Sequence, residues 1–209
     1  MAYTTINKST DHFNTLTWTG DGGTKSFTGV GFAPDLVWSK ARVALSGITG
    51  AHFLFDSVRG GGAEKEIRST STGAEGDSAN QVYGYVSSFD SDGFTTTAGS
   101  SNNNYFNESS KTYVSWNWKA GTTGSGTSTG SGTGKAYSYS VNTTAGFSIV
   151  KYTGNGSSGH TIPHHLGAIP QFIILKPLDA ADNWRVYHQG LDADAADFHL
   201  QLQSTGSRS

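Results

Sequence analysis

The sequence contains no cysteine among its 209 residues. It can therefore form no disulfide bond and no cysteine-based zinc site, and it offers no thiolate nucleophile. Strand pairing and packing must supply its stability. Aromatic residues make up 12% of the chain and include five tryptophans, which are enough to build compact cores.

Charged residues are also scarce, at 14% of the chain against roughly 25% in ordinary globular domains. With a net charge of −2, the chain lacks the basic face that attracts nucleic acid or an anionic membrane. Ser, Thr, Asn and Gly take the place of the charges. This neutral, hydroxyl-rich composition is typical of extracellular and virion β-proteins.

Long apolar runs are absent. No run approaches the roughly 18 residues of a membrane span, and residues 1–8 lack the apolar core of a secretion signal. We therefore expect synthesis in a host cytoplasm without secretory export, no membrane span, and release by lysis or as part of a particle.

Short runs rich in β-branched and aromatic residues recur along the chain, bounded by Gly, Asn, Asp or Pro. Helical periodicity is missing apart from one short turn at 192–197. The pattern predicts an all-β fold, an antiparallel β-sandwich of jelly-roll or lectin-like type. The expected strands are Phe13–Thr19, Leu36–Lys40, His52–Val58, Gln81–Ser87, Gly93–Thr97, Thr112–Trp118, Phe147–Thr153, Gln171–Lys176 and Trp184–His188.

The segment 112–118 shows the two-residue alternation of a strand most clearly. We expect Val114, Trp116 and Trp118 on a buried face. The intervening residues Tyr113, Ser115 and Asn117 are expected on a wet face.

Residues 121–136 form a Gly/Ser/Thr-rich tract that separates two apolar-patterned parts. The tract has little to bury and much conformational entropy to lose, so it is interpreted as a flexible linker. The alternative is a fibre neck that orders against copies of itself. The expected organisation is a first β-sandwich unit at 1–120, the linker, and a second unit at 137–209.

The two parts resemble each other. Trp18-Thr19-Gly20-Asp21-Gly22 returns as Tyr152-Thr153-Gly154-Asn155-Gly156, an offset of 152 − 18 = 134. The run 30–40 matches 166–176, and His52-Phe53-Leu54-Phe55 matches Asn183-Trp184-Arg185-Val186. The Gly-Asp-Gly and Gly-Asn-Gly triplets are typical of tight hairpin turns.

The second copy stops early, because nothing after Gly206 matches residues 74–118. A sandwich that lacks its last strands exposes apolar faces and open edges. We therefore expect an incomplete second related unit, in a piece of a longer chain or completed by a partner subunit. Ordered structure beyond residue 140 should pack on the first unit or on other chains.

Several motifs resemble a known group of proteins. They are the stretches 2–9, 29–38, 52–60, 88–94 and 115–121 of the first unit, with 142–150 and 183–188 of the second. In combination they are similar to tail-fibre-like virion structural proteins of marine bacteriophages, such as those of cyanobacteria. The resemblance implies a non-enzymatic component of a tail or capsid appendage, built from tandem β-sandwich units.

Candidate metal ligands are few. His160, His164, His165 and His188 invite a metal hypothesis, but no His-Glu-x-x-His pattern occurs, and surface or interface histidines are favoured. Asp90-Ser91-Asp92-Gly93 resembles half a calcium loop, although a turn closing a hairpin is favoured. The acidic group Asp192, Asp194 and Asp197 is interpreted as a solvated loop.

Candidate catalytic groups are equally sparse. The glutamates available for a glycosidase-like pair are Glu64, Glu66, Glu75 and Glu108, mostly in Gly-rich, charged turns, and no Gly-x-Ser-x-Gly elbow is present. Tyr83 and Tyr85 alternate with valines and are candidates for outward-facing sugar-stacking residues, with ordinary cross-strand packing favoured.

These observations favour a structural virion protein without catalytic, cofactor or metal residues, its ligand-binding residues unassigned. The expected partners are other virion proteins of tail or capsid and copies of the chain itself, with a trimer favoured. Two alternatives stay open: a carbohydrate-binding, lectin-like module that recognises a host-surface glycan, and a capsid decoration or fibre protein. A hydrolase is the least favoured hypothesis.

Overall fold

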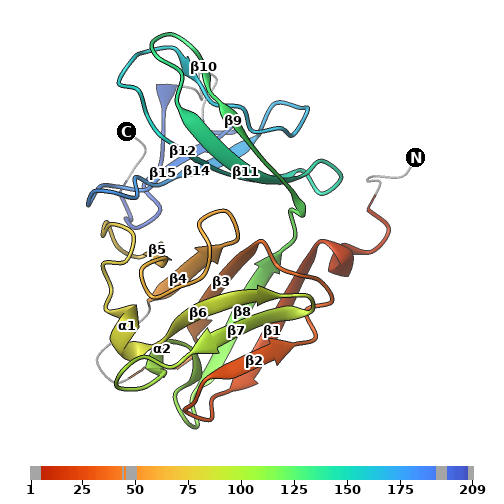
Figure 1. Ribbon diagram of the computed structural model, residues 1–209, viewed down its shortest axis with the longest axis vertical. Helices are drawn as coiled ribbons and strands as arrows, with labels where there is room; N and C mark the ends of the chain where they lie inside the picture. The colour runs from red at the N-terminus through yellow and green to blue at the C-terminus, as the bar shows by residue number, and fades with distance from the viewer. Residues whose placement is uncertain (1–5, 44, 46–50, 192–196, 207–209) are drawn as a thin grey trace.

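The computed structural model describes residues 6–43, 45, 51–191 and 197–206, and the fold is an all-β arrangement of antiparallel sheets (Figure 1). The acidic turn expected at 192–197 lies outside the described residues except for Asp197. In the first region, residues 6–120, the elements are η1 (Ser9–Asp11), β1 (Phe13–Thr19), β2 (Lys25–Thr28), β3 (Leu36–Ala41), β4 (His52–Asp56), β5 (Ile67–Arg68), α1 (Asn80–Tyr83), β6 (Tyr85–Asp90), β7 (Gly93–Thr97), α2 (Asn104–Asn107) and β8 (Thr112–Trp118). In the second region, residues 121–206, they are β9 (Thr122–Thr127), β10 (Thr129–Gly130), β11 (Ala136–Asn142), β12 (Phe147–Tyr152), β13 (His160–Thr161), β14 (Phe172–Leu175) and β15 (Arg185–His188).

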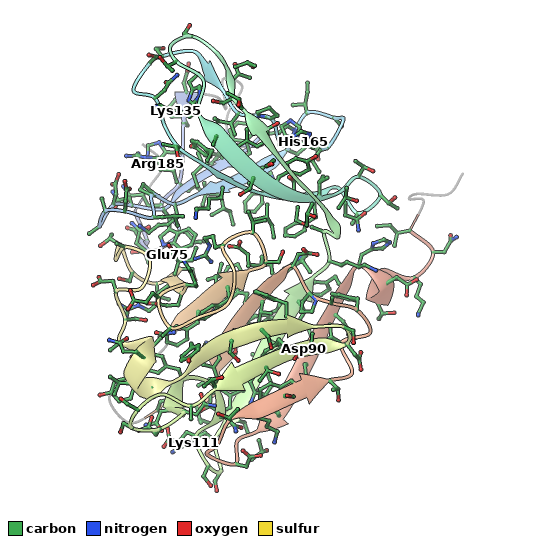
Figure 2. The ribbon with its side chains drawn as sticks, viewed as in Figure 1. Glu75, Asp90, Lys111, Lys135, His165 and Arg185 are labelled. Carbon is green, nitrogen blue, oxygen red and sulfur yellow. The ribbon has the colours of Figure 1, made fainter. Side chains whose placement is uncertain are left out.

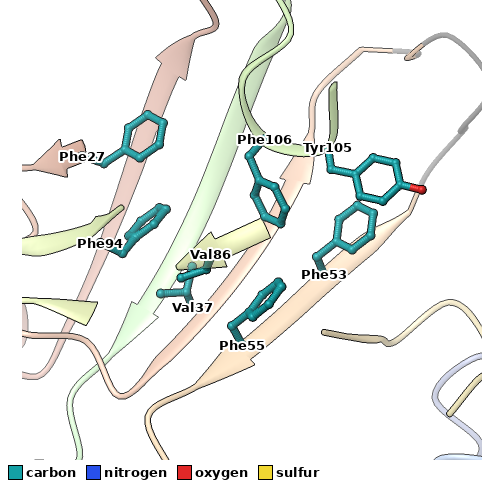
Figure 3. Close-up of a cluster of buried hydrophobic side chains, with 8 residues drawn as sticks. All are labelled: Phe27, Val37, Phe53, Phe55, Val86, Phe94, Tyr105 and Phe106. Carbon is teal, nitrogen blue, oxygen red and sulfur yellow. The ribbon is translucent and has the colours of Figure 1, made fainter. Parts of the chain in front are cut away.

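The first region is a β-sandwich, as predicted. A five-stranded sheet in the order β1-β8-β3-β4-β5 packs against a three-stranded sheet in the order β2-β7-β6. Between them lies a core of aromatic and valine side chains (Figure 3). Its buried members are Phe27, Val37, Phe53, Phe55, Val86, Phe94, Tyr105 and Phe106.

The second region packs on part of the opposite face of the five-stranded sheet. Trp184 is buried against Leu54 and Ile67, and its indole N–H lies 2.9 Å from the Arg68 carbonyl oxygen and 3.0 Å from that of Ser71. The buried Asp35 carboxylate accepts a hydrogen bond from the Ser140 hydroxyl of β11 at 2.9 Å. The expectation that structure beyond residue 140 packs on the first unit is therefore confirmed.

The predicted alternation of β8 is present, but the assignment of its faces was wrong. Tyr113, Ser115 and Asn117 are fully buried inside the sandwich, whereas Trp116 and Trp118 lie on the outer face of the sheet. The inward polar groups are hydrogen-bonded: the Asn117 amide donates to the Ser115 hydroxyl at 3.0 Å. Because the second region packs on part of the outer face, hydrophobicity alone does not mark the interior of the sandwich.

The Gly/Ser/Thr tract differs from the flexible linker that was expected. Residues Thr122–Thr127 form β9, which pairs with β11 and extends the sheet β12-β11-β9. Gly124 and Gly126 lie opposite Tyr139 and Tyr137, whose rings cover them so closely that an added Cβ would meet the phenol oxygens at 2.6 and 2.7 Å. Tyrosines therefore supply the packing that a glycine-rich strand cannot make itself.

The two parts of the chain that resemble each other in sequence contain equivalent strands, and one of these strands has a different partner in each part. The hairpin β3–β4 has its counterpart in β14–β15, where Phe172 pairs with His188 as Leu36 pairs with Asp56. The positions in the two hairpins make Leu54 equivalent to Val186, whereas the sequence comparison aligns Leu54 with Arg185, one residue earlier. Strand β12 corresponds to β1, but β12 pairs with β11 whereas β1 pairs with β8.

Three local predictions need correction. The Gly20–Gly22 turn is not a hairpin: it leads from β1 to β2 in the other sheet, and Gly20 lies so close to the chain at Glu108 that a Cβ would meet its carbonyl oxygen at 2.1 Å. Likewise, β12 and β13, on either side of Gly154–Gly156, do not pair with each other. The expected strand 81–87 begins as α1 and becomes β6 only after Gly84, whose φ is +102°.

Within the described residues, no helix has the length and apolar character needed to cross a bilayer.

Candidate functional site

Three exposed apolar side chains of the second region lie on or beside β14. We call Ile169, Phe172 and Leu175 the β14 patch; they are 89%, 55% and 43% exposed. Phe172 and Leu175 are three positions apart on the strand, so they flank its edge from opposite faces. Strand β15 pairs with β14 on one side and forms a bridge with Leu200 on the other. The outer edge of β14 has no strand partner among the described residues.

This edge can accept another strand. Its unpaired backbone N–H and C=O groups are a template for sheet extension, and a two-stranded sheet is marginally stable by itself. Adding a strand there would satisfy the backbone groups and would cover part of the β14 patch on each face of the strand.

A second feature is an aromatic pocket on the outer face of the five-stranded sheet. It has a volume of about 290 Å³ and is lined by Trp38, His52, Trp116 and Trp118 from β3, β4 and β8. The rings of His52 and Trp116 are parallel within 4°, with centroids 6.4 Å apart. Trp38 stands at 71° to His52 and 74° to Trp116, so the three rings form a corner.

The position of His52 is fixed by a hydrogen bond. The Trp38 indole N–H donates to His52 Nδ1 at 2.9 Å, which leaves Nε2 as the protonated nitrogen of the neutral ring. Burial and the nearby Lys40 cation lower the pKa of His52. The ring is therefore neutral at pH 7 and carries one N–H donor that has no partner among the described residues.

A third feature is a buried carboxyl group. Glu66, only 1% exposed, contacts the Ser78 hydroxyl, which also contacts the Asn80 side-chain oxygen. Burial raises the pKa of Glu66 to about 7. A hydroxyl has one proton to donate, so a protonated Glu66 supplies the second proton that this pair of contacts needs. The sequence placed most of the four candidate glutamates in Gly-rich, charged turns; Glu66 lies directly before β5 and is buried.

Glu75 lies near the junction of the two regions (Figure 2), and its backbone N–H donates to the Leu178 carbonyl oxygen at 2.8 Å. Its carboxylate is 3.1 Å from the buried Arg59 guanidinium, which also pairs with Asp56. Glu64 is exposed and Glu108 is partly buried. The four residues that line the aromatic pocket include no carboxylate, so the structure does not bring a pair of glutamates together there.

The candidate histidines make separate local contacts. His165 stacks on Tyr139 with ring centroids 3.7 Å apart, as Figure 2 places it in the second region, and His160 Nε2 lies 2.5 Å from the Ser128 hydroxyl. His164 Nδ1 accepts from the Leu166 N–H, and His188 Nδ1 accepts from the Gly190 N–H. In the part of the chain that the structure describes, no group of three or more potential ligands is placed to hold a metal ion.

Asp90 and Asp92 close the β6–β7 hairpin, as predicted. Asp92 accepts the N–H groups of Gly29 at 2.9 Å and Gly31 at 2.6 Å, which lowers its pKa and fixes the loop before β3. Tyr83 and Tyr85 do not form an outward pair. Both pack against the sandwich core, Tyr83 from α1 and Tyr85 from β6.

The residues of the aromatic pocket were missed as a site, although their signal was in the sequence. Trp116 and Trp118 recur two positions apart on one strand, and Trp38 precedes a strand that begins at His52. Their meeting depends on the register of β3 with β8, in which Trp38 pairs with Trp116.

The fold and these features define an all-β sandwich protein with an open strand edge and an aromatic pocket. The chain belongs to a family described as a domain of unknown function (DUF7483), whose pattern it matches over residues 8–209. No curated protein and no solved structure matches it.

Proposed function

We propose that the protein is a non-enzymatic structural module that associates with copies of itself through the edge of β14. The observation that carries this proposal is the β14 patch beside an unpaired strand edge. Exposed apolar side chains next to open backbone groups favour addition of a strand from another chain.

The surface chemistry is compatible with self-association. A net charge of −2 on 209 residues gives little repulsion between copies. The β14 edges of two copies could pair antiparallel about a twofold axis, or a different segment could add in a ring. The trimer expected from the sequence belongs to the second arrangement.

The biological setting in this proposal is a virion appendage of tail or capsid, made in the host cytoplasm and released by lysis. It rests on the resemblance to tail-fibre-like proteins and on the hydroxyl-rich composition. In that setting the module would contact other virion proteins as well as copies of itself.

The test is the concentration dependence of the molar mass, measured by sedimentation equilibrium or light scattering. We expect masses above that of one chain at micromolar concentration for the unaltered protein, and a single-chain mass for Phe172→Asp and Ile169→Asp. The control is Val43→Asp, which places the same charge at another exposed apolar residue, 45% exposed, in the first region. A monomeric unaltered chain, or equal effects of all three substitutions, would contradict the proposal.

A further inference from the structure

We infer that the aromatic pocket of Trp38, His52, Trp116 and Trp118 is a carbohydrate-binding site that takes one sugar ring against its aromatic walls. This function is separate from assembly, because the pocket lies on β3, β4 and β8 of the first region and shares no residue with the β14 patch.

The shape of the pocket supports a small, ring-shaped ligand. Its volume of about 290 Å³ lies just below the range for drug-sized small-molecule sites, roughly 300–1,000 Å³. Trp38 stands nearly perpendicular to the parallel rings of His52 and Trp116, and its own ring is held by the bond to His52 Nδ1. A rigid apolar corner on regular strands is preorganised for a ligand with a flat apolar face.

The wall of the pocket is almost entirely apolar, because it is made of aromatic ring surface. Its rings can therefore stack on a ligand but offer few polar contacts inside the pocket. A ligand that lays a flat apolar face on these rings while its polar groups stay in water matches this wall. The C–H face and hydroxyl groups of a sugar ring have this combination.

The local charge argues against the other usual ligand of an aromatic cage, a quaternary ammonium ion. Such cations bind aromatic faces most strongly when no like charge is near. Here the Lys40 ammonium acts on His52, and the pocket's lining in the described part of the chain includes no carboxylate to balance a bound cation. The site therefore favours neutral or acidic sugars over ammonium ligands.

The experiment uses the full chain on a broad array of bacterial, algal and plant glycans, followed by fluorescence titration with the glycans that bind. Three of the five tryptophans line the pocket, so saturable binding should change the intrinsic emission. We expect Trp116→Ala to weaken binding by about tenfold or more, and Trp116→Phe to weaken it less, since a smaller aromatic wall remains.

The matched control is Tyr152→Ala, which removes an aromatic side chain that is 43% exposed and lies outside the pocket. Its glycan binding should equal that of the unaltered chain. The anionic dye 8-anilinonaphthalene-1-sulfonate and choline serve as comparison ligands. Three results would each overturn the inference. The first is no saturable glycan binding, whether or not the dye binds. The others are tighter binding of choline than of any glycan, and unchanged glycan binding in Trp116→Ala. Loss of glycan binding leaves the assembly proposal intact if the molar mass is unaffected.

Discussion

The two regions of the molecule differ in how the apolar side chains of their strands are buried. In the first region, two sheets enclose a core whose aromatic members, such as Phe53 and Phe106, are buried almost completely. In the second region, β14 and β15 bury Trp184 against the first region but leave Phe172 and Leu175 exposed. The first region therefore builds a core from its own two sheets, whereas the second region buries Trp184 only by packing on the first region.

This difference shows which forces order each region. The sandwich is stabilised by non-local strand pairs such as β1 with β8, which join residues about a hundred positions apart in the sequence. The second region packs on the outer face of the same sheet. There Leu54 points away from Phe53 and Phe55 and contacts Trp184. One strand, β4, consequently contributes to two hydrophobic clusters.

The largest effect is expected from the sandwich core. Phe53→Ala removes a fully buried ring and should lower the free energy of unfolding by about 3–5 kcal/mol. Phe172→Ala is the matched control, since its ring is 55% exposed, and its effect should stay within about 0.5 kcal/mol for the dissociated monomer. Urea denaturation measures both. Equal losses would contradict the contrast between the regions.

Trp184→Ala should release the second region while the sandwich stays folded. It removes the buried ring and the N–H that contacts the carbonyl oxygens of Arg68 and Ser71, a local loss of about 3 kcal/mol or more. Hydrogen exchange should accelerate in β14 and β15 and stay slow in β3 and β8. Trp184→Phe keeps a ring without the donor and should lose less. Unfolding of both regions together in the alanine variant would show that they form one cooperative unit.

Glu66 makes stability depend on pH in a defined direction. Its pKa is raised from 4.5 in the unfolded chain to about 7 in the fold, so the folded state holds the proton more tightly. The stabilisation is fully present below pH 4.5 and is lost as the pH rises through about 7. At about 1.4 kcal/mol for each pH unit in that window, the loss amounts to about 3 kcal/mol.

Glu66→Gln should remove this pH dependence and raise stability at pH 8 relative to the unaltered chain. Denaturation at pH 5 and pH 8 measures the effect, with Glu64→Gln as the control because Glu64 is exposed. An unchanged pH profile in Glu66→Gln would mean that Glu66 titrates normally in the fold.

The smallest effect is expected in the glycine-rich strand. A Cβ at Gly124 would lie 2.6 Å from the phenol oxygen of Tyr139, so Gly124→Val should destabilise the β9–β11 pairing by about 1–3 kcal/mol. Ser125 lies on the opposite, exposed face of β9, and Ser125→Val should be nearly neutral. Exchange rates of the β11 amides distinguish the two. Equal rates would show that the tyrosine rings move aside freely.

Much of the strand pattern of the first region could be predicted from the sequence. Phe13–Thr19, Gly93–Thr97 and Thr112–Trp118 are strands with the expected bounds, because alternation and flanking turn residues act locally. The orientation of β8 could not be predicted. Its tryptophans looked like core residues, and only the position of the second region shows that the outer face is also partly covered.

The remaining misses share the same physical cause, which is long-range pairing. The tract 121–136 reads as a linker unless Gly124 and Gly126 are matched with Tyr139 and Tyr137 across a ladder. The aromatic pocket needs the register that places Trp38 beside Trp116, 78 positions later. The burial of Glu66 depends on how Ser78 and Asn80 fold over it.

The most direct test of an open second region is hydrogen exchange at β14 as a function of protein concentration. If copies pair along this edge, the amides of Phe172–Leu175 that face away from β15 become more protected as the concentration rises, and those of β3 do not change. Protection of β14 that is the same at nanomolar and at high micromolar concentration would contradict self-association through this strand.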